Sequence, residues 1–247
     1  MSSSISELRR EVWRANRGLA DADLVVLAFG NASGVDRSAG VMAIKPSGVD
    51  CRSVEAAELV VVDLASGQVV EGDLRPSSDA STHLELYRSF RSIGGVVHTH
   101  SPHATAWAQA QRPIPCLGTT HADYLRGPVP VTRHLSDDEI AGDYERNTGM
   151  VIIERYGLGD VNAEEMPAVL IAGHGAFAWG RTPSAAVEMA IALEQLARIA
   201  TYQVALGSLP EIPTALIDRH FSRKHGPHAY YGQRVGATLD AGDGHEK

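Results

Sequence analysis

The stretch Gly95-Val96-Val97-His98-Thr99-His100 joins an apolar run to two histidines that are one residue apart. The run predicts a buried strand, and successive side chains of a strand point to opposite faces. His98 and His100 therefore lie on the same face at the end of that strand. Two neighbouring imidazoles are costly to bury unless their ring nitrogens find partners, and a metal ion satisfies both. The pattern predicts half of a metal site.

A third histidine, His174, follows a similar apolar run over residues 168–173. Three neutral imidazole nitrogens suit zinc or another divalent transition metal, and an open fourth position makes such a site catalytic. The chain has 11 histidines in all. The ordinary interpretation of any one of them is a hydrogen-bonded core residue.

Composition limits the classes of function. The chain has 247 residues, of which 44% are hydrophobic, enough for one large domain. A net charge of -8 argues against nucleic-acid binding. Cys51 and Cys116 have no CxxC spacing, which favours a reducing cytoplasm.

Neither a secretory signal nor a membrane span is expected. The first residues lack a basic region followed by an apolar stretch. The longest apolar-leaning stretch, residues 185–205, includes Glu188, Glu194 and Arg198, which is typical of an amphipathic helix.

Hydrophobic periodicity and turn residues predict an α/β protein with a mixed, mainly antiparallel sheet flanked by helices. Gly30-Asn31 is expected to end the first strand, Ser66-Gly67 to form a hairpin turn, and Ser136 with Glu139 to open a helix as a capping box. Helices are expected over residues 4–19, 78–90, 102–110, 136–147, from near 183, and over 213–225, and strands over 24–29, 41–45, 59–64, 68–70 and the two histidine runs. We expect one domain over residues 1–233 and a polar, disordered tail over residues 234–247.

Three short loops combine glycine, serine and other polar residues. They are Gly30-Asn31-Ala32-Ser33, Lys45-Pro46-Ser47-Gly48 and Pro76-Ser77-Ser78-Asp79. Taken singly, the first two are ordinary turns and the third is a helix N-cap. Taken together, backbone N–H groups in such loops and at a helix start can bind an anion such as phosphate.

Two further polar segments carry acid/base candidates. Gly118-Thr119-Thr120-His121-Ala122-Asp123-Tyr124 is either a solvated loop or a source of an acid/base residue, in His121 or Asp123. Ala229-Tyr230-Tyr231-Gly232-Gln233 either docks the tail or offers a tyrosine hydroxyl for proton transfer.

These motifs, in this order, resemble the L-ribulose-5-phosphate 4-epimerases of the class II aldolase/adducin superfamily, over residues 5–233. The His-x-His pair with a distal histidine is common to the superfamily. The Thr-Thr-His-Ala-Asp-Tyr and Tyr-Tyr-Gly-Gln segments are typical of the epimerase branch. The resemblance implies a three-layer class II aldolase-like fold and a homotetramer with active sites between subunits.

The resemblance also implies roles for individual residues. His98, His100 and His174 would bind Zn²⁺, with Asp79 as a fourth ligand or close neighbour. Asp123 and Tyr231 would be the acid/base pair. The pocket for a small-molecule sugar phosphate would be lined by Gly30, Asn31, Lys45, Ser47, Gly48, Ser77 and Ser78.

Two alternatives stay open. The first is a class II sugar-phosphate aldolase, for example of the L-fuculose-1-phosphate type. Aldolase relatives carry glutamate where this chain has Asp79, which favours the epimerase. The second is a non-catalytic, adducin-like interaction module, which the intact set of three histidines argues against.

Overall fold

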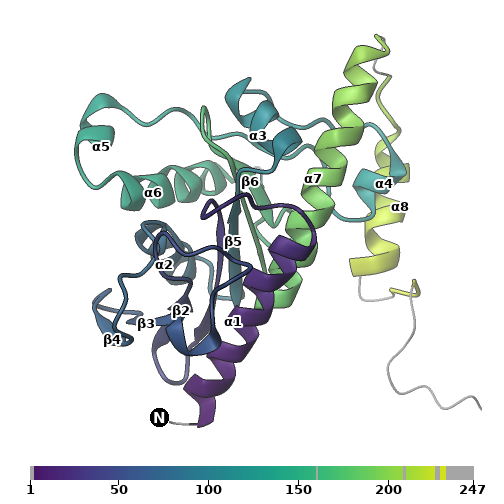
Figure 1. The fold of residues 1–247 in the computed structure, drawn as a ribbon. Coiled ribbons are helices and arrows are strands. Elements are labelled where there is room, and N and C mark those ends of the chain that lie inside the picture. The colour runs from purple at the N-terminus through teal and green to yellow at the C-terminus, as the bar shows by residue number, and fades with distance from the viewer. Residues whose placement is uncertain (1–2, 160, 208–209, 226–228, 232–247) are drawn as a thin grey trace, which may run out of the picture.

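A computed structural model describes residues 3–159, 161–207, 210–225 and 229–231 (Figure 1). Gly232, Gln233 and the predicted tail lie outside the described residues. The centre of the fold is a seven-stranded sheet of order β4-β3-β2-β1-β5-β7-β6, and all its pairings of named strands are antiparallel. The strands are β1 (Asn31–Asp36), β2 (Val41–Ile44), β3 (Val60–Asp63), β4 (Val69–Glu71), β5 (Gly95–Thr99), β6 (Ala168–Leu170) and β7 (Ala176–Gly180).

Helices cover both faces of this sheet, which gives the predicted three layers (Figure 1). Adjacent residues of β1 point to opposite faces of the sheet, and each face packs on different helices. Ser33 bonds to α2 (Ala80–Ser89), whereas a side chain at Gly34 would run into α1 (Ser3–Asp21) and α7 (Pro183–Ala205). The remaining helices are α3 (Pro102–Gln109), α4 (Thr119–Ala122), α5 (Asp137–Ala141), α6 (Tyr144–Gly157), α8 (Thr214–His225) and the short 3-10 helix η1 (Ala56–Glu58). Among these, α6 packs on α2.

Most of the predicted elements are confirmed to within a few residues. The hairpin at Ser66-Gly67 joins β3 to β4, and the capping box of Ser136 and Glu139 opens α5. None of the described helices combines the length and the apolar composition needed to cross a bilayer.

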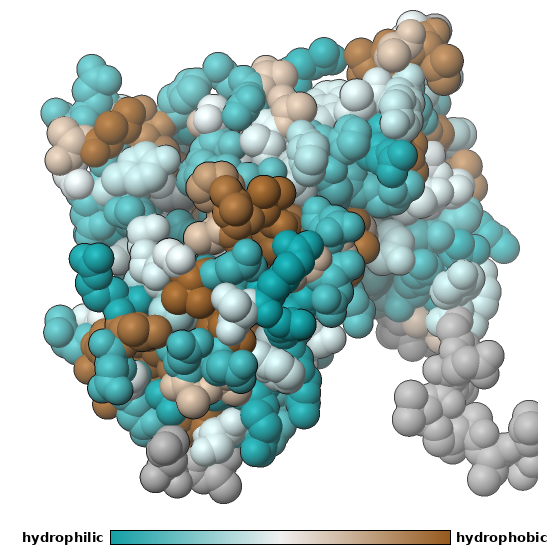
Figure 2. All heavy atoms as spheres, in the orientation of Figure 1, coloured by the Kyte–Doolittle hydropathy of each residue, from teal (hydrophilic) through white to brown (hydrophobic). Residues whose placement is uncertain are grey.

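The strand predicted over residues 24–29 is wrong. This segment is a loop, and the first strand starts at Asn31, where the sequence suggested a stop. Leu27 has φ 56° and Gly30 has φ 81°, so the backbone cannot stay extended through the run. Val26, Leu27 and Phe29 are each more than half exposed. Figure 2 shows an apolar patch near the middle of the visible face, where this loop crosses in Figure 1.

The helix predicted over residues 136–147 is two helices. α5 ends at Ala141 with Gly142 as its C-cap, and Asp143 caps a new helix, α6, by accepting a hydrogen bond from the Arg146 backbone N–H. The segment with Asp123 is not only a solvated loop, because α4 buries His121. The sequence reading also missed strand β7, which follows His174.

Candidate metal centre

Three histidines from two separate segments converge at one end of the sheet. His98 Nε2 lies 3.0 Å from His100 Nε2, which lies 3.1 Å from His174 Nε2. Their three ring centroids are 4.8, 4.9 and 4.8 Å apart. Tetrahedral ligands at about 2.0–2.1 Å from zinc place neighbouring nitrogens about 3.3 Å apart. The triad therefore has the size and shape of one metal's ligand set, as its chemistry also allows.

Strand register explains why these rings meet. His98 on β5 pairs with Asn31 on β1 and with Phe177 on β7, so the three side chains share a face. Phe177 stacks on His98 with ring centroids 4.3 Å apart. His174 lies in the turn between β6 and β7, and Gly175 beside it passes so close to β5 that a Cβ there would come within 2.8 Å of the Thr99 carbonyl oxygen.

The outer nitrogens of two ligands have fixed partners. His98 Nδ1 lies 3.0 Å from the Ala176 carbonyl oxygen, which can only accept, so Nδ1 carries the proton. In the neutral ring this leaves the Nε2 lone pair free to bind a metal. The Tyr144 hydroxyl lies 3.4 Å from His174 Nδ1 and supports that ring from α6.

Burial favours the neutral form of two of the three histidines, His100 and His174. Burial, helped by the neighbouring imidazoles, lowers the pKa of His174 to about 4, and burial also lowers the pKa of His100. Neutral imidazoles at ordinary pH are what a metal requires. Three nitrogen lone pairs that face one another also favour a shared cation.

Asp79 lies beside the three histidines, and its carboxylate makes no hydrogen bond to the helix that follows it. It is the N-cap residue of α2, as the N-cap interpretation of this segment predicted, but its side chain makes no capping hydrogen bond. The Asn31 amide donates to its Oδ2 at 2.6 Å. Burial raises the pKa of Asp79, yet His98, His83 and the Asn31 bond outweigh burial and hold that pKa below its usual value. A carboxylate of this kind can complete a metal's ligands or bind its water.

The three predicted anion-binding loops meet around one pocket of about 250 Å³ beside the histidines. Its lining includes the whole predicted substrate set, Gly30, Asn31, Lys45, Ser47, Gly48, Ser77 and Ser78, together with Asp79, His98, His100 and His174. Ser47 and Ser78 are exposed to the pocket mouth, whereas Asn31 and Ser77 are buried in its wall.

Lys45 is more enclosed than a typical substrate-binding cation. It is 1% exposed, and its Nζ donates to the carbonyl oxygens of Val49 at 2.5 Å and Pro46 at 3.4 Å. Burial lowers the pKa of this ammonium group. Lys45 therefore braces the loop that carries Ser47 and Gly48, and it places a positive charge behind the pocket.

The predicted acid/base residues, Asp123 and Tyr231, lie elsewhere in the protomer. Neither lines the metal pocket. Asp123 follows α4 and accepts hydrogen bonds from Arg223 and His220 of α8. The Arg223 guanidinium lies 4.8 Å from the Tyr231 ring centre. The structure thus brings Asp123 and Tyr231 to one cluster, and it separates that cluster from the histidines of the same chain.

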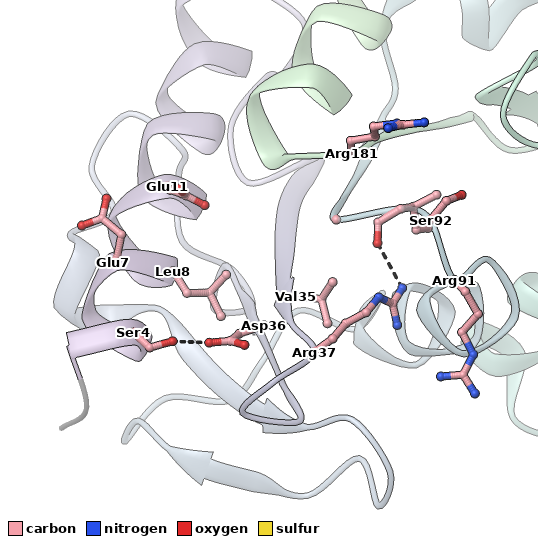
Figure 3. Close-up of a pocket in the computed structure, with 12 residues that line it drawn as sticks. Ser4, Glu7, Leu8, Glu11, Val35, Asp36, Arg37, Arg91, Ser92 and Arg181 are labelled. Carbon is pink, nitrogen blue, oxygen red and sulfur yellow. Dashed lines mark hydrogen bonds between the residues drawn. The ribbon is translucent and has the colours of Figure 1, made fainter.

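A larger hollow of about 590 Å³ lies at the opposite end of the sheet (Figure 3). Glu7 and Glu11 of α1 lie on one side of it, and Arg91 and Arg181 lie on the other. Among the described residues that line it there is no cluster of metal ligands, and all four of these charged side chains are exposed. Chemistry rather than volume therefore marks the smaller pocket as the candidate site.

Sequence reasoning missed four residues of the site's surroundings. Tyr144 and Glu145 line the pocket because α6 begins there, and Phe29 lines it from the loop mistaken for a strand. His83 is completely buried under the site. The only signal for His83 is its spacing of one helical turn after Asp79.

An antiparallel sheet between helical layers, with three histidines at one end, defines the class as a class II aldolase-type α/β protein. The class II aldolase and adducin N-terminal domain family matches residues 10–201, and the chain belongs to that family.

Solved structures agree with this assignment. An L-fuculose 1-phosphate aldolase is 26% identical, with a TM-score of 0.74 over 90% of this chain and 97% of its own. An L-fuculose-1-phosphate aldolase from Thermus thermophilus is 24% identical, with a TM-score of 0.62 over 83% and 98% of the two chains. An aldolase II superfamily protein from Pseudomonas syringae is 17% identical, with a TM-score of 0.72 over 93% and 90%. The last two likenesses show the fold alone.

Proposed function

We propose that this protein is a zinc-dependent epimerase that interconverts L-ribulose 5-phosphate and D-xylulose 5-phosphate. The observation that carries the proposal is the convergence of His98, His100 and His174 on a pocket lined by three small polar loops. The resemblance noted in the sequence also implies that Asp79 replaces the glutamate expected of an aldolase, which favours the epimerase. The epimerase-type segments around Asp123 and Tyr231 also pack together.

The carbon that inverts, C4, has no acidic proton, so the reaction needs carbon–carbon cleavage. A base takes the proton of the C4 hydroxyl, the C3–C4 bond breaks, and its electron pair forms the enediolate of dihydroxyacetone. The other fragment is glycolaldehyde phosphate. After its aldehyde turns over, the bond forms again on the opposite face, and an acid returns the proton to the C4 oxygen.

The chain's own residues would supply the binding and proton transfers. Backbone and hydroxyl groups of the three loops would hold the phosphate, so that the aldehyde cannot escape between the two steps. Asp123 and Tyr231 would serve the C4 oxygen from either side of the aldehyde. A divalent metal held by the three histidines would supply Lewis-acid stabilisation of the developing negative charge.

This assignment requires a second copy of the chain. Asp123 and Tyr231 do not line the metal pocket of their own protomer, so another protomer would have to bring them there. The exposed apolar residues Val26, Leu27 and Phe29 adjoin that pocket and offer a surface that a neighbour could cover. We propose a homotetramer with its active sites between subunits. Cys51 and Cys116 are free thiols, which supports our proposal that the protein works in the reducing cytoplasm.

Product identification tests the activity. Purified protein is incubated with L-ribulose 5-phosphate, with and without a chelator. We expect D-xylulose 5-phosphate, and we expect the chelator to abolish its formation. Recovery of L-ribulose 5-phosphate alone from the metal-loaded protein would overturn the proposal.

Complementation tests the shared site. His98→Asn and Asp123→Asn are each expected to be inactive as pure proteins. Unfolded together and refolded as a mixture, they should regain part of the activity, because some sites then combine an intact triad with an intact Asp123. No gain over the separate variants would contradict the assignment of Asp123 to a site shared between protomers.

A second candidate is a sugar-phosphate aldolase. The likeness to an L-fuculose 1-phosphate aldolase, at 26% identity over 90% of the chain, favours it. The products separate the two reactions. Free dihydroxyacetone phosphate and an aldehyde from L-fuculose 1-phosphate would indicate an aldolase.

A further inference from the structure

A buried hydrogen-bond chain runs beneath the metal pocket, and the proposed reaction makes no use of it. The Tyr87 hydroxyl lies 2.8 Å from Ser33 Oγ, which lies 2.7 Å from His83 Nδ1. All three side chains are buried, and the chain ties α2 to β1. Ser33 is two residues from Asn31 on the same face of β1. The hydrogen-bond chain therefore lies next to the residue that bonds to Asp79.

The far nitrogen of His83 is an exception among buried polar groups. Within the described part of the chain, His83 Nε2 has no hydrogen-bond partner, and neither has Asn31 Oδ1. A phenylalanine would fill this space without leaving a polar atom unpaired, so the imidazole calls for an explanation. The two unpartnered atoms belong to Asn31, which bonds to Asp79 from β1, and to His83, which follows Asp79 by one turn of α2.

Helix geometry directs His83 toward the site. It follows Asp79 by one turn of α2, and helical side chains lean back toward the preceding turn. Its ring meets the Phe177 ring edge-on at 5.8 Å, and Phe177 stacks on the metal-site residue His98. Burial lowers the pKa of His83 to about 3, although the charge of Asp79 opposes that shift. The ring is therefore neutral, with one N–H and one lone pair.

We propose that His83 is a positioning residue of the metal site. In the proposed arrangement the Ser33 hydroxyl, 2.7 Å away, donates to Nδ1, and the ring hydrogen is carried by Nε2. Nε2 has no hydrogen-bond partner among the described residues of this structure, and in the metal-bound protein its N–H would donate to the Asp79 carboxylate, hold it beside the three histidines and so raise the affinity for the metal. The inference rests on the proposed metal site. Partners of this kind typically change metal affinity by roughly 10- to 100-fold.

The test measures metal binding without any substrate. The dissociation constant of Zn²⁺ is measured by competition with a chromophoric chelator, and the Co²⁺ absorption spectrum reports the ligand geometry. His83→Gln keeps an amide nitrogen near the position of Nε2, whereas His83→Asn keeps one near Nδ1 only. We expect His83→Gln to bind Zn²⁺ within about threefold of the native protein, and His83→Asn to bind it at least about tenfold more weakly with an altered Co²⁺ spectrum.

Two further variants separate positioning from simple packing. Ser33→Ala removes the hydrogen bond to His83 Nδ1 and should weaken Zn²⁺ binding. Tyr87→Phe removes only the next hydrogen bond along, between Tyr87 and Ser33, so it should weaken Zn²⁺ binding less. Equal Zn²⁺ affinities for the native protein, His83→Asn and Ser33→Ala would overturn the role of His83 and leave the metal site standing. Absence of Zn²⁺ binding to the native protein would overturn both proposals. Because all of these variants are compared with one another, loss of folding in one of them does not decide the outcome.

Discussion

Asp123 and Arg223 form a two-pronged ion pair, with Nε 2.9 Å from Oδ1 and Nη2 2.7 Å from Oδ2. The pair links α4 to α8 across 100 residues of sequence. Burial raises the pKa of Asp123, but the bonds from Arg223 and His220 outweigh burial and lower it. The carboxylate is thus ionised and fixed in direction.

Replacement of Asp123 should remove an acid/base group. Asp123→Asn is expected to reduce epimerisation at least about a hundredfold. The rate is measured as D-xylulose 5-phosphate formed under saturating L-ribulose 5-phosphate. A variant that retains the native rate would show that the role belongs to another residue.

Replacement of Arg223 should shift the pH dependence instead. Without the guanidinium the pKa of Asp123 rises, so the group becomes protonated at a higher pH. The acidic limb of the kcat/KM profile of Arg223→Gln should therefore move to higher pH. Arg219→Gln, on the same helix but without an assigned role, is the matched control and should leave the profile in place.

Loss of a single triad histidine should abolish metal binding and activity together. His98→Asn removes a ligand whose tautomer the Ala176 carbonyl fixes. We expect less than about one-tenth of the native zinc content by elemental analysis, and no activity above the chelated native enzyme. His134→Asn, an exposed histidine outside the triad, serves as the control. An active His98→Asn protein without bound metal would contradict the zinc proposal.

Stability of the metal-free protein should fall between pH 6.5 and 4. Burial lowers the pKa of His121 from 6.5 to about 4, so in this range the unfolded chain binds a proton that the folded chain does not. The free energy of unfolding therefore decreases as the pH falls. His121→Gln keeps a donor for the Gly127 carbonyl and removes the titration, so its stability should depend less on pH by up to about 3 kcal/mol over this window. Equal pH dependence of the two proteins, measured by urea denaturation, would contradict the assignment.

The shared face of His98 and His100 could be predicted from the sequence because strand periodicity is local. Two histidines at positions i and i+2 share a face wherever the strand lies in the sheet. The polar loops beside the strand can also be predicted locally, because turns depend on only a few neighbouring residues. Phe29 shows where local reasoning failed: an apolar run is typical of a strand, but residues with positive φ turn this one into an exposed loop.

Long-range packing accounts for the other omissions. The meeting of Asp123 with Arg223 depends on how α8 docks, which no spacing encodes. His83 resembles any core histidine until its hydrogen-bond partners are known. Its place beneath Asp79 follows from the packing of α2 on β1, not from the sequence pattern.

The close approach of the two segments that carry the three histidines depends on Gly175. A Cβ at this position would lie 2.8 Å from the Thr99 carbonyl oxygen and 3.3 Å from His98 Cε1, so backbone or ligand must move. Gly175→Ala is expected to cost about 1–3 kcal/mol in stability and to weaken Zn²⁺ binding by separating His174 from His98. Differential scanning calorimetry and chelator competition measure the two effects. Gly157→Ala, at the end of α6, has no atom within 4 Å of the added carbon and should alter neither. If Gly175→Ala binds zinc as tightly as the Gly157→Ala control, the close approach of the two segments is not what holds the triad together.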